Sequence, residues 1–324
     1  MTIKGHVPAE GRASVWRRIA GLHRPLVTAS VAAALLTVIT FAATMLDSRT
    51  LLGEPIWLKP FKFSVSITLY AVTLAWMISF LNPVARRWAW WIGSVIAVLL
   101  GVEMVVIILQ VIRGQRSHFN IATTLNQDLY IVMGVSIAVV WALNLILAVF
   151  VVRERIEDTA IRLAIRSGLV IALAGMAVAF FMVLPTGQQV SAIGHGAAVP
   201  FLGAHSVGVP DGSPGIPLTG WNLTGGDLRA PHFLGLHGLQ ALPLLAIALQ
   251  VLAGRWVRLR SEVIRARLVA TGAFGYGGLF LLTSWQALRG QSLVRPDALT
   301  LGVAAALIVG VIVGVALAFR NPTT

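Results

Sequence analysis

Glu103 is the residue whose position most strongly indicates chemistry, because it is a lone acid inside a long apolar stretch, residues 88–112. If that stretch is a helix, Glu103 lies roughly 13 Å from its end, at about 1.5 Å per residue. An ionisable group at such a depth in a membrane costs about 2.5–3.5 kcal/mol, so it is expected to face the protein interior and to have a partner. The carboxyl group could exchange a proton with a ligand. Alternatively, it could stay protonated and join two helices through a hydrogen bond.

Three further polar residues are expected to line a cavity with Glu103. Gln110 lies two helical turns further along the same stretch, so it shares the face of Glu103. His237 and Gln240 lie at a similar depth in another apolar stretch, residues 231–253, where their spacing makes them neighbours on a helix. Histidine titrates near neutral pH, and a carboxylic acid can both donate and accept a proton. We therefore predict Glu103 and His237 as an acid–base pair, with Gln110 and Gln240 as ligand-binding residues.

Basic residues are expected together at one rim of the molecule, where several apolar stretches end. Lysine and arginine side chains there could bind a phosphate or carboxylate group, and arginine could do so through two parallel hydrogen bonds. The partner would be an anionic lipid or an amphipathic small-molecule anion. The alternative is that these side chains only reach towards lipid head groups without a specific role. The residues concerned are Lys59, Lys62, Arg113, Arg116, Arg229 and Arg289.

The pattern Q-x-x-R-G-Q occurs twice, at residues 110–115 and 286–291, each time where an apolar stretch ends. A glycine follows the arginine in both copies, and glycine in this place commonly ends a helix in a left-handed conformation. The repeated element is therefore predicted to be a helix end that holds an amide and a guanidinium group at the rim. Gln286 joins Gln110 as a predicted ligand-binding residue.

The histidines keep a haem or metal site as an alternative interpretation. Five of the seven are expected at the same side as the basic rim: His118, His195, His205, His232 and His237. We count His118 and His232 among the ligand-binding residues. His232 and His237 are about 140° apart around a helix, so they cannot bind one ion from a single helical face. The chain has no cysteine, which excludes thiolate metal sites and iron–sulfur clusters.

Several other classes of function lack their sequence patterns. There is no phosphate-binding P-loop, no H-E-x-x-H zinc helix and no G-x-S-x-G turn. The formal net charge of +13 comes from short basic clusters between apolar stretches rather than from a continuous basic stripe, so we expect no nucleic-acid partner.

The composition indicates that these residues are held by membrane-spanning helices. Hydrophobic residues make up 57% of the chain and charged residues only 11%, which is more apolar than a soluble domain. A spanning helix needs roughly 20 predominantly apolar residues. The sequence therefore predicts an all-α integral membrane protein with eight transmembrane helices. Their expected ranges are 25–46, 61–82, 88–112, 129–152, 167–185, 231–253, 267–288 and 297–319.

The distribution of lysine and arginine predicts the orientation. When the amino terminus is placed inside, most basic residues fall in the inner segments, as the positive-inside rule requires. Both termini are therefore expected in the cytoplasm, and the membrane is expected to be a cytoplasmic (inner) membrane of the bacterial type. Residues 1–24 are interpreted as a basic cytoplasmic tail before an uncleaved first helix. Residues 153–166 form a cytoplasmic loop, and residues 320–324 form a short cytoplasmic tail.

Two four-helix halves in the same orientation, residues 25–152 and 167–319, are predicted from internal similarity. Besides the repeated Q-x-x-R-G-Q, the sequence K-P-F-K-F at 59–63 is similar to R-A-P-H-F at 229–233. The outer segment 186–230 is long and rich in glycine, and it is too apolar for a solvated linker. We expect it to pack on the outer face as a lid, with disorder as the alternative.

In layout, with eight helices in two similar four-helix halves, the chain resembles haem A synthase. That family relies on histidines within the second and fourth helices of both halves. The second, fourth and eighth predicted helices of this chain contain none. No residue roles are therefore carried over from the resemblance.

The sequence thus predicts a polytopic membrane protein with an outward-facing pocket of cationic residues, histidines and glutamate. This pocket would bind or act on an amphipathic anionic small molecule or lipid. Three alternatives stay open. The first is a proton-coupled secondary transporter whose halves rock about a central site. The second is a membrane redox protein that binds haem or quinone, and the third is a purely structural membrane subunit.

Overall fold

The computed structural model describes residues 21–320, so most of the predicted tail 1–24 and nearly all of the tail 320–324 lie outside the described residues. The described chain is mainly helical and has almost no sheet. Within it, eight helices are long and apolar enough to cross a membrane. The prediction of an all-α polytopic membrane protein is confirmed.

The spanning helices are joined by short connections, except for one long outer segment. They are α2 (Arg24–Leu46), α3 (Leu58–Ile78), α4 (Pro83–Ile112), α5 (Thr124–Arg153), α6 (Thr159–Met182), α8 (Arg229–Leu252), α9 (Glu262–Leu288) and α10 (Ala298–Ala318). The short elements are helix α7 (Gly187–Gly194), the 3-10 turn η1 (Val257–Arg260) and the strands β1 (Thr50–Leu51), β2 (Glu54–Pro55), β3 (Ser206–Val207) and β4 (Gly226–Asp227). Strand β1 pairs with β2 and β3 pairs with β4, both antiparallel.

Several helices begin earlier than hydropathy predicts, because polar capping residues start them before the apolar part begins. Helix α6 begins at Thr159 rather than near residue 167, since the side chain of Asp158 accepts a hydrogen bond from the amide of Ile161. Helix α9 begins at Glu262 rather than near residue 267, and Ser261 caps it in the same way.

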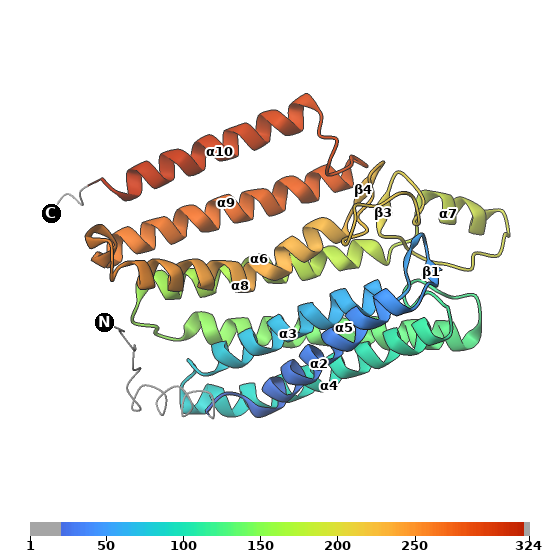
Figure 1. Cartoon of the computed structure of the whole chain (residues 1–324), viewed down its shortest axis with the longest axis horizontal. Coiled ribbons are helices and arrows are strands. Elements are labelled where there is room, and N and C mark those ends of the chain that lie inside the picture. Colours follow the sequence, from blue (N-terminus) through green and yellow to red (C-terminus); the bar gives the residue numbers. More distant parts are fainter. Residues whose placement is uncertain (1–20, 321–324) are drawn as a thin grey trace, which may run out of the picture.

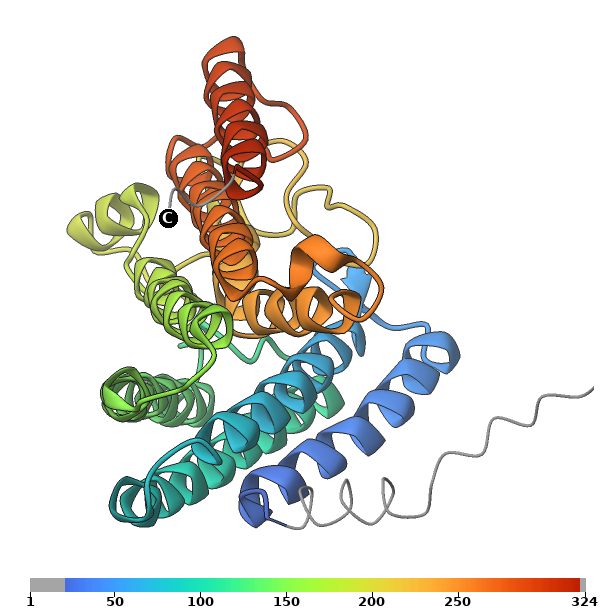
Figure 2. The same ribbon diagram turned by 90° about the vertical axis from the view of Figure 1, so that its left-hand side faces the viewer.

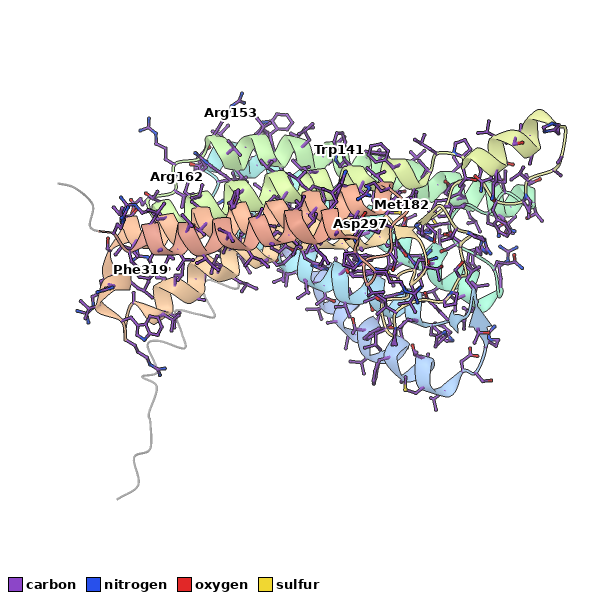
Figure 3. All side chains as sticks on the ribbon, turned by 90° about the horizontal axis from the view of Figure 1, so that it is seen from above. Trp141, Arg153, Arg162, Met182, Asp297 and Phe319 are labelled. Carbon is purple, nitrogen blue, oxygen red and sulfur yellow. The ribbon has the colours of Figure 1, made fainter. Side chains whose placement is uncertain are left out.

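The first spanning helix begins and the last one ends at the same end of the bundle (Figure 1). Helix α7 and the four short strands lie at the opposite end, which we call the outer end. Arg153 and Arg162 lie at the end away from these outer elements (Figure 3). This arrangement is what eight spans require, while the assignment of the outer end to one side of the membrane stays a prediction.

Helices of the two predicted halves pair in the same order. Helix α2 packs on α3, α3 on α4 and α4 on α5, just as α6 packs on α8, α8 on α9 and α9 on α10. Figure 2, which looks along the bundle from its inner end, shows α9 and α10 on the side away from α2, α3 and α4. A parallel duplication would produce this order, and the duplication itself stays a prediction.

The two Q-x-x-R-G-Q segments form equivalent helix ends, at the outer ends of α4 and α9. Gly114 and Gly290 both have a positive φ, 67° and 70°, which glycine adopts without the steric cost that a side chain would add. In both copies the amide of the last glutamine donates to the carbonyl oxygen of the first, at 2.8 and 3.1 Å. The side chain of the first glutamine also donates to the backbone carbonyl six residues on, at 3.4 and 2.8 Å. The element therefore closes the helix and fixes the loop that follows.

The closest helix pair, α6 and α8, meets through glycines. A Cβ atom added at Gly175 would lie 2.6 Å from the Cα of Gly235, and one added at Gly168 would lie 2.8 Å from the carbonyl oxygen of Gly238. Small residues commonly allow such close backbone approach between membrane helices. The contact also positions α8, since His232 Nδ1 lies 2.8 Å from the carbonyl oxygen of Gly175.

We predict that Gly175→Val destabilises the protein, because the added methyl groups have no room against α8. The expected loss is about 1–3 kcal/mol, as for other overpacked interiors. The midpoint of thermal unfolding in detergent measures it. Gly134→Ala in α5 is the matched control, because a Cβ there meets nothing within 4 Å and alanine favours a helix. An unchanged midpoint for Gly175→Val would contradict the close α6–α8 contact.

Candidate functional site

Two adjoining cavities lie in the outer part of the bundle. The outer cavity, of about 150 Å³, lies beneath the outer loops, and the inner cavity, of about 180 Å³, lies among α3, α4, α5, α6 and α8. Both are lined by Phe63, His118, His232 and Phe233. A single ligand that occupied both cavities would therefore have its two ends in different surroundings.

The outer cavity is lined by four cationic side chains, two of which are already paired. Arg229 contacts Asp227 at 2.7 Å, and Lys62 Nζ donates to Glu54 at 3.2 Å. The four cations are Lys59, Lys62, Arg116 and Arg229.

Of these four cations, Lys59 and Arg116 have no carboxylate of residues 21–320 within ion-pair distance. Lys59 Nζ instead lies 3.0 Å from His118 Nδ1, and the guanidinium group of Arg116 lies 4.0 Å from the ring centre of Phe201. An anion bound beside these two basic side chains would supply the direct counter-charge that each of them lacks.

The inner cavity is mainly apolar, with polar side chains on part of its wall. Its polar residues include Glu103, His237 and Gln240, three of the four side chains that the sequence predicted for one cavity, whereas the fourth, Gln110, does not line it. The apolar lining includes Ile67, Leu100, Val140, Trp141, Phe180 and Leu236.

Glu103 is 1% exposed, and in residues 21–320 neither carboxyl oxygen has a hydrogen-bond partner. The nearest titratable atom is His118 Nε2, 3.6 Å from Oε1, which is beyond a hydrogen bond. Buried polar groups in proteins almost always have a partner, because leaving one without costs free energy. The carboxyl group of Glu103 is thus free to hydrogen-bond a molecule in the cavity.

Lys59, His118 and Glu103 form a chain of polar groups from the outer cavity to the inner one. Burial, and next the charge of Lys59, hold the pKa of His118 well below its usual 6.5. When Lys59 is protonated its ammonium group can only donate, so a neutral His118 then accepts at Nδ1 and carries its proton on Nε2, the atom that lies 3.6 Å from Glu103. The histidine beside Glu103 is thus His118. His237 Nδ1 lies 3.3 Å from Gln240 Oε1 instead.

The other predicted rim residues lie at the two helix ends and line neither cavity. Arg113 Nη1 donates to Gln110 Oε1 at 2.6 Å and to Asn126 Oδ1, in the first turn of α5, at 3.0 Å. Arg289 pairs with Asp297, the N-cap of α10, at 2.7 Å. In the described chain Gln110, Arg113, Gln286 and Arg289 therefore connect each helix end to the next element.

The outer segment supplies cavity residues that the sequence prediction did not place in the site. His205 and Asp211 line the outer cavity, and His205 Nδ1 lies 3.1 Å from Asp211 Oδ2. Burial lowers the pKa of His205. Burial opposes the charge on Asp211, but hydrogen bonds from His205 and Ser206 nevertheless hold the pKa of that carboxyl well below its usual range. The grouping of five histidines at the outer side was the sequence signal that could have indicated His205. Of these five, His205 is the one that the segment 186–230 brings to the cavity.

No group of three or more histidine, aspartate or glutamate side chains within residues 21–320 has an arrangement that could hold a metal ion.

The fold defines the chain as a polytopic helical membrane protein with a buried polar site near its outer end. Comparison with protein-family models, with curated proteins and with solved structures finds no match to this chain.

We predict that the protein loses stability when the pH falls from 7 to 5. The folded state holds His118 and His205 neutral, whereas the unfolded chain takes up protons on these histidines near pH 6.5. The unfolded state then binds more protons, so the stability present at pH 7 is lost progressively below about pH 6.5. His118→Gln should reduce the fall of the thermal unfolding midpoint in detergent. The exposed His195→Gln is the control and should leave it unchanged. An equal fall in both variants would rule out His118 as a cause.

Proposed function

We propose that the protein binds an amphipathic anionic molecule, with the anionic group in the outer cavity and the apolar part in the inner cavity. We further propose that Glu103, assisted by His118, exchanges a proton with it. The proposal is carried by a cationic cavity that adjoins an apolar one, with four lining residues shared between them.

The charges support an anion rather than a cation at the outer end. Lys59 and Arg116 lack a carboxylate partner among the described residues, whereas the nearby acids Glu54, Asp211 and Asp227 are already engaged. A bound cation would have to lie beside two basic side chains that have no carboxylate in direct contact, and like charges repel strongly where water is scarce.

The lining of the inner cavity supports an apolar chain on the same molecule. Each methylene group that leaves water for an apolar cavity contributes about 0.8 kcal/mol. The single acid in that wall would face the ligand near the junction of the two cavities, because His118 lines both.

The arrangement of Lys59, His118 and Glu103, in that order from the outer cavity to the inner one, supports acid–base chemistry at Glu103. The carboxylate can accept a proton from a hydroxyl group or from an acidic C–H group of the ligand. The positive charge of Lys59 would then stabilise the negative charge that develops on the ligand. Neutral His118 keeps the two charged groups apart and orients Nε2–H towards the carboxylate.

Proton-coupled transport is the second function that one observation favours, because the cavities lie between the two predicted halves, where transporters of this architecture bind their substrates. Against it, the space towards the inner end is filled by closely packed apolar side chains. These include Leu74, Met77, Leu147, Ile165, Leu239 and Leu242, each at most 2% exposed. Uptake into proteoliposomes driven by a pH gradient would favour transport over the binding or acid–base function.

We predict that Lys59→Gln weakens binding of decanesulfonate about tenfold or more, which corresponds to about 1.4 kcal/mol. This probe is an apolar chain with a permanent negative charge, and isothermal titration in detergent measures its Kd. Arg295→Gln is the matched control, because Arg295 is an exposed outer cation that lines neither cavity.

Two further ligands test the amphipathic character of the site. Decyltrimethylammonium has a chain of the same length and the opposite charge, and methanesulfonate has the anionic group without the chain. Both are expected to bind much more weakly than decanesulfonate. Equal binding of decyltrimethylammonium would contradict the proposed function.

We predict that decanesulfonate binding is accompanied by proton uptake and that Glu103→Gln removes most of it. The negative charge bound in the outer cavity makes the potential at Glu103 more negative and so favours the protonated acid, and the probe itself carries no titratable group. Titrations in buffers of different ionisation enthalpy measure the protons exchanged. His195→Gln should keep the wild-type uptake, and unchanged uptake in Glu103→Gln would exclude Glu103 as the proton acceptor.

A further inference from the structure

A third hollow, a groove of about 440 Å³, lies on the flank of the bundle between α3 and α8. Tyr276 of α9 and Trp221 of the outer segment complete its wall. The groove shares Lys62 with the outer cavity and shares Ser66 and His237 with the inner cavity. It therefore adjoins both parts of the site described above.

Phe233 lies at the junction, because it lines the groove and both cavities. Its ring stacks on that of His237, with the planes 20° apart and the centres 6.5 Å apart. Tyr276 holds this part of α8 in place, since its hydroxyl group donates to the carbonyl oxygen of Leu234 at 2.6 Å. Both rings therefore line the groove and the inner cavity at once.

The helix surfaces beside the groove are apolar and exposed. On α3, Leu69 and Val72 continue the face of Val65 towards the membrane centre and are 43% and 41% exposed. On α8, Leu244 lies two turns beyond His237 and is 62% exposed. An acyl chain in the bilayer would therefore meet a continuous apolar surface that leads to the stacked rings, with the cation of Lys62 at the upper end of the groove.

We infer that this groove is a lateral entrance through which the chain of a single-chain anionic lipid passes from the bilayer into the inner cavity, with Phe233 and His237 as its gate. The inference rests on the proposed function and adds the source of the ligand, which is the membrane rather than the surrounding water. The anionic group would move along the Lys62 side of the groove, so that it never crosses the hydrocarbon interior, where a charge is costly.

The test uses the full chain in lipid nanodiscs and takes advantage of the absence of native cysteine. Val65 lines the groove and neither cavity, so Val65→Cys labelled with pyrene maleimide places the bulky group in the groove. Val313→Cys, on the lipid-facing side of α10, is the matched control and carries the same label.

One probe is hexadecanesulfonate with bromine on its chain, which resides in the bilayer and quenches tryptophan. Trp141 in the inner cavity reports its arrival, and Trp141→Phe identifies that signal. The other probe is hexanesulfonate, which stays in water.

The label at Val65→Cys is expected to slow loading of the brominated hexadecanesulfonate at least tenfold and to leave the Kd of hexanesulfonate unchanged. The label at Val313→Cys is expected to change neither. If the long chain loads at the control rate while hexanesulfonate still binds, the lateral entrance is wrong and the proposed function stands. If neither sulfonate binds the unlabelled protein, the proposed function fails and the entrance has no role.

Discussion

A polar group inside a hydrocarbon bilayer has few possible hydrogen-bond partners, and the site depends on this constraint. Water solvates a carboxyl group anywhere on a soluble protein, but inside a bilayer the group must find a protein atom, a proton or a guest. Glu103 lies next to a neutral imidazole at 3.6 Å and has no hydrogen bond within the described chain. The site is therefore built around an acid whose hydrogen-bonding capacity the protein does not use.

The helix contacts explain how that acid and the histidines come to the same place. Glycines let α6 and α8 approach closely, and this contact fixes the height and rotation of α8, which carries His232 and His237. Helix α4 ends in a left-handed glycine turn, and the chain then folds back so that His118 reaches Lys59 and approaches Glu103. The turn thus contributes to the site by directing the loop rather than by lining a cavity.

Much of the fold could be predicted from the sequence, because the length and apolar character of a spanning helix are local properties. The shared wall formed by Glu103, His237 and Gln240 could also be predicted, since depth along a helix follows from residue counting. The position of His118 could not, because it depends on how a loop returns after the helix, and no periodicity describes that path. The partners of Arg113 and Arg289 could not be predicted for a similar reason. Asn126 and Asp297 belong to the next helix, and only the folded turn brings them close to the two arginines.

Under the proposed function, the apolar packing beneath the inner cavity would have an energetic consequence. Tyr70 and Asn144 hydrogen-bond to each other at 2.6 Å, and beyond them Leu74, Met77 and Leu147 fill the space towards the inner end. Protons that reach or leave Glu103 would therefore pass through the outer cavity alone. Such chemistry would neither consume nor dissipate the proton-motive force, and its rate would follow the acidity of one compartment, however strongly the membrane is energised.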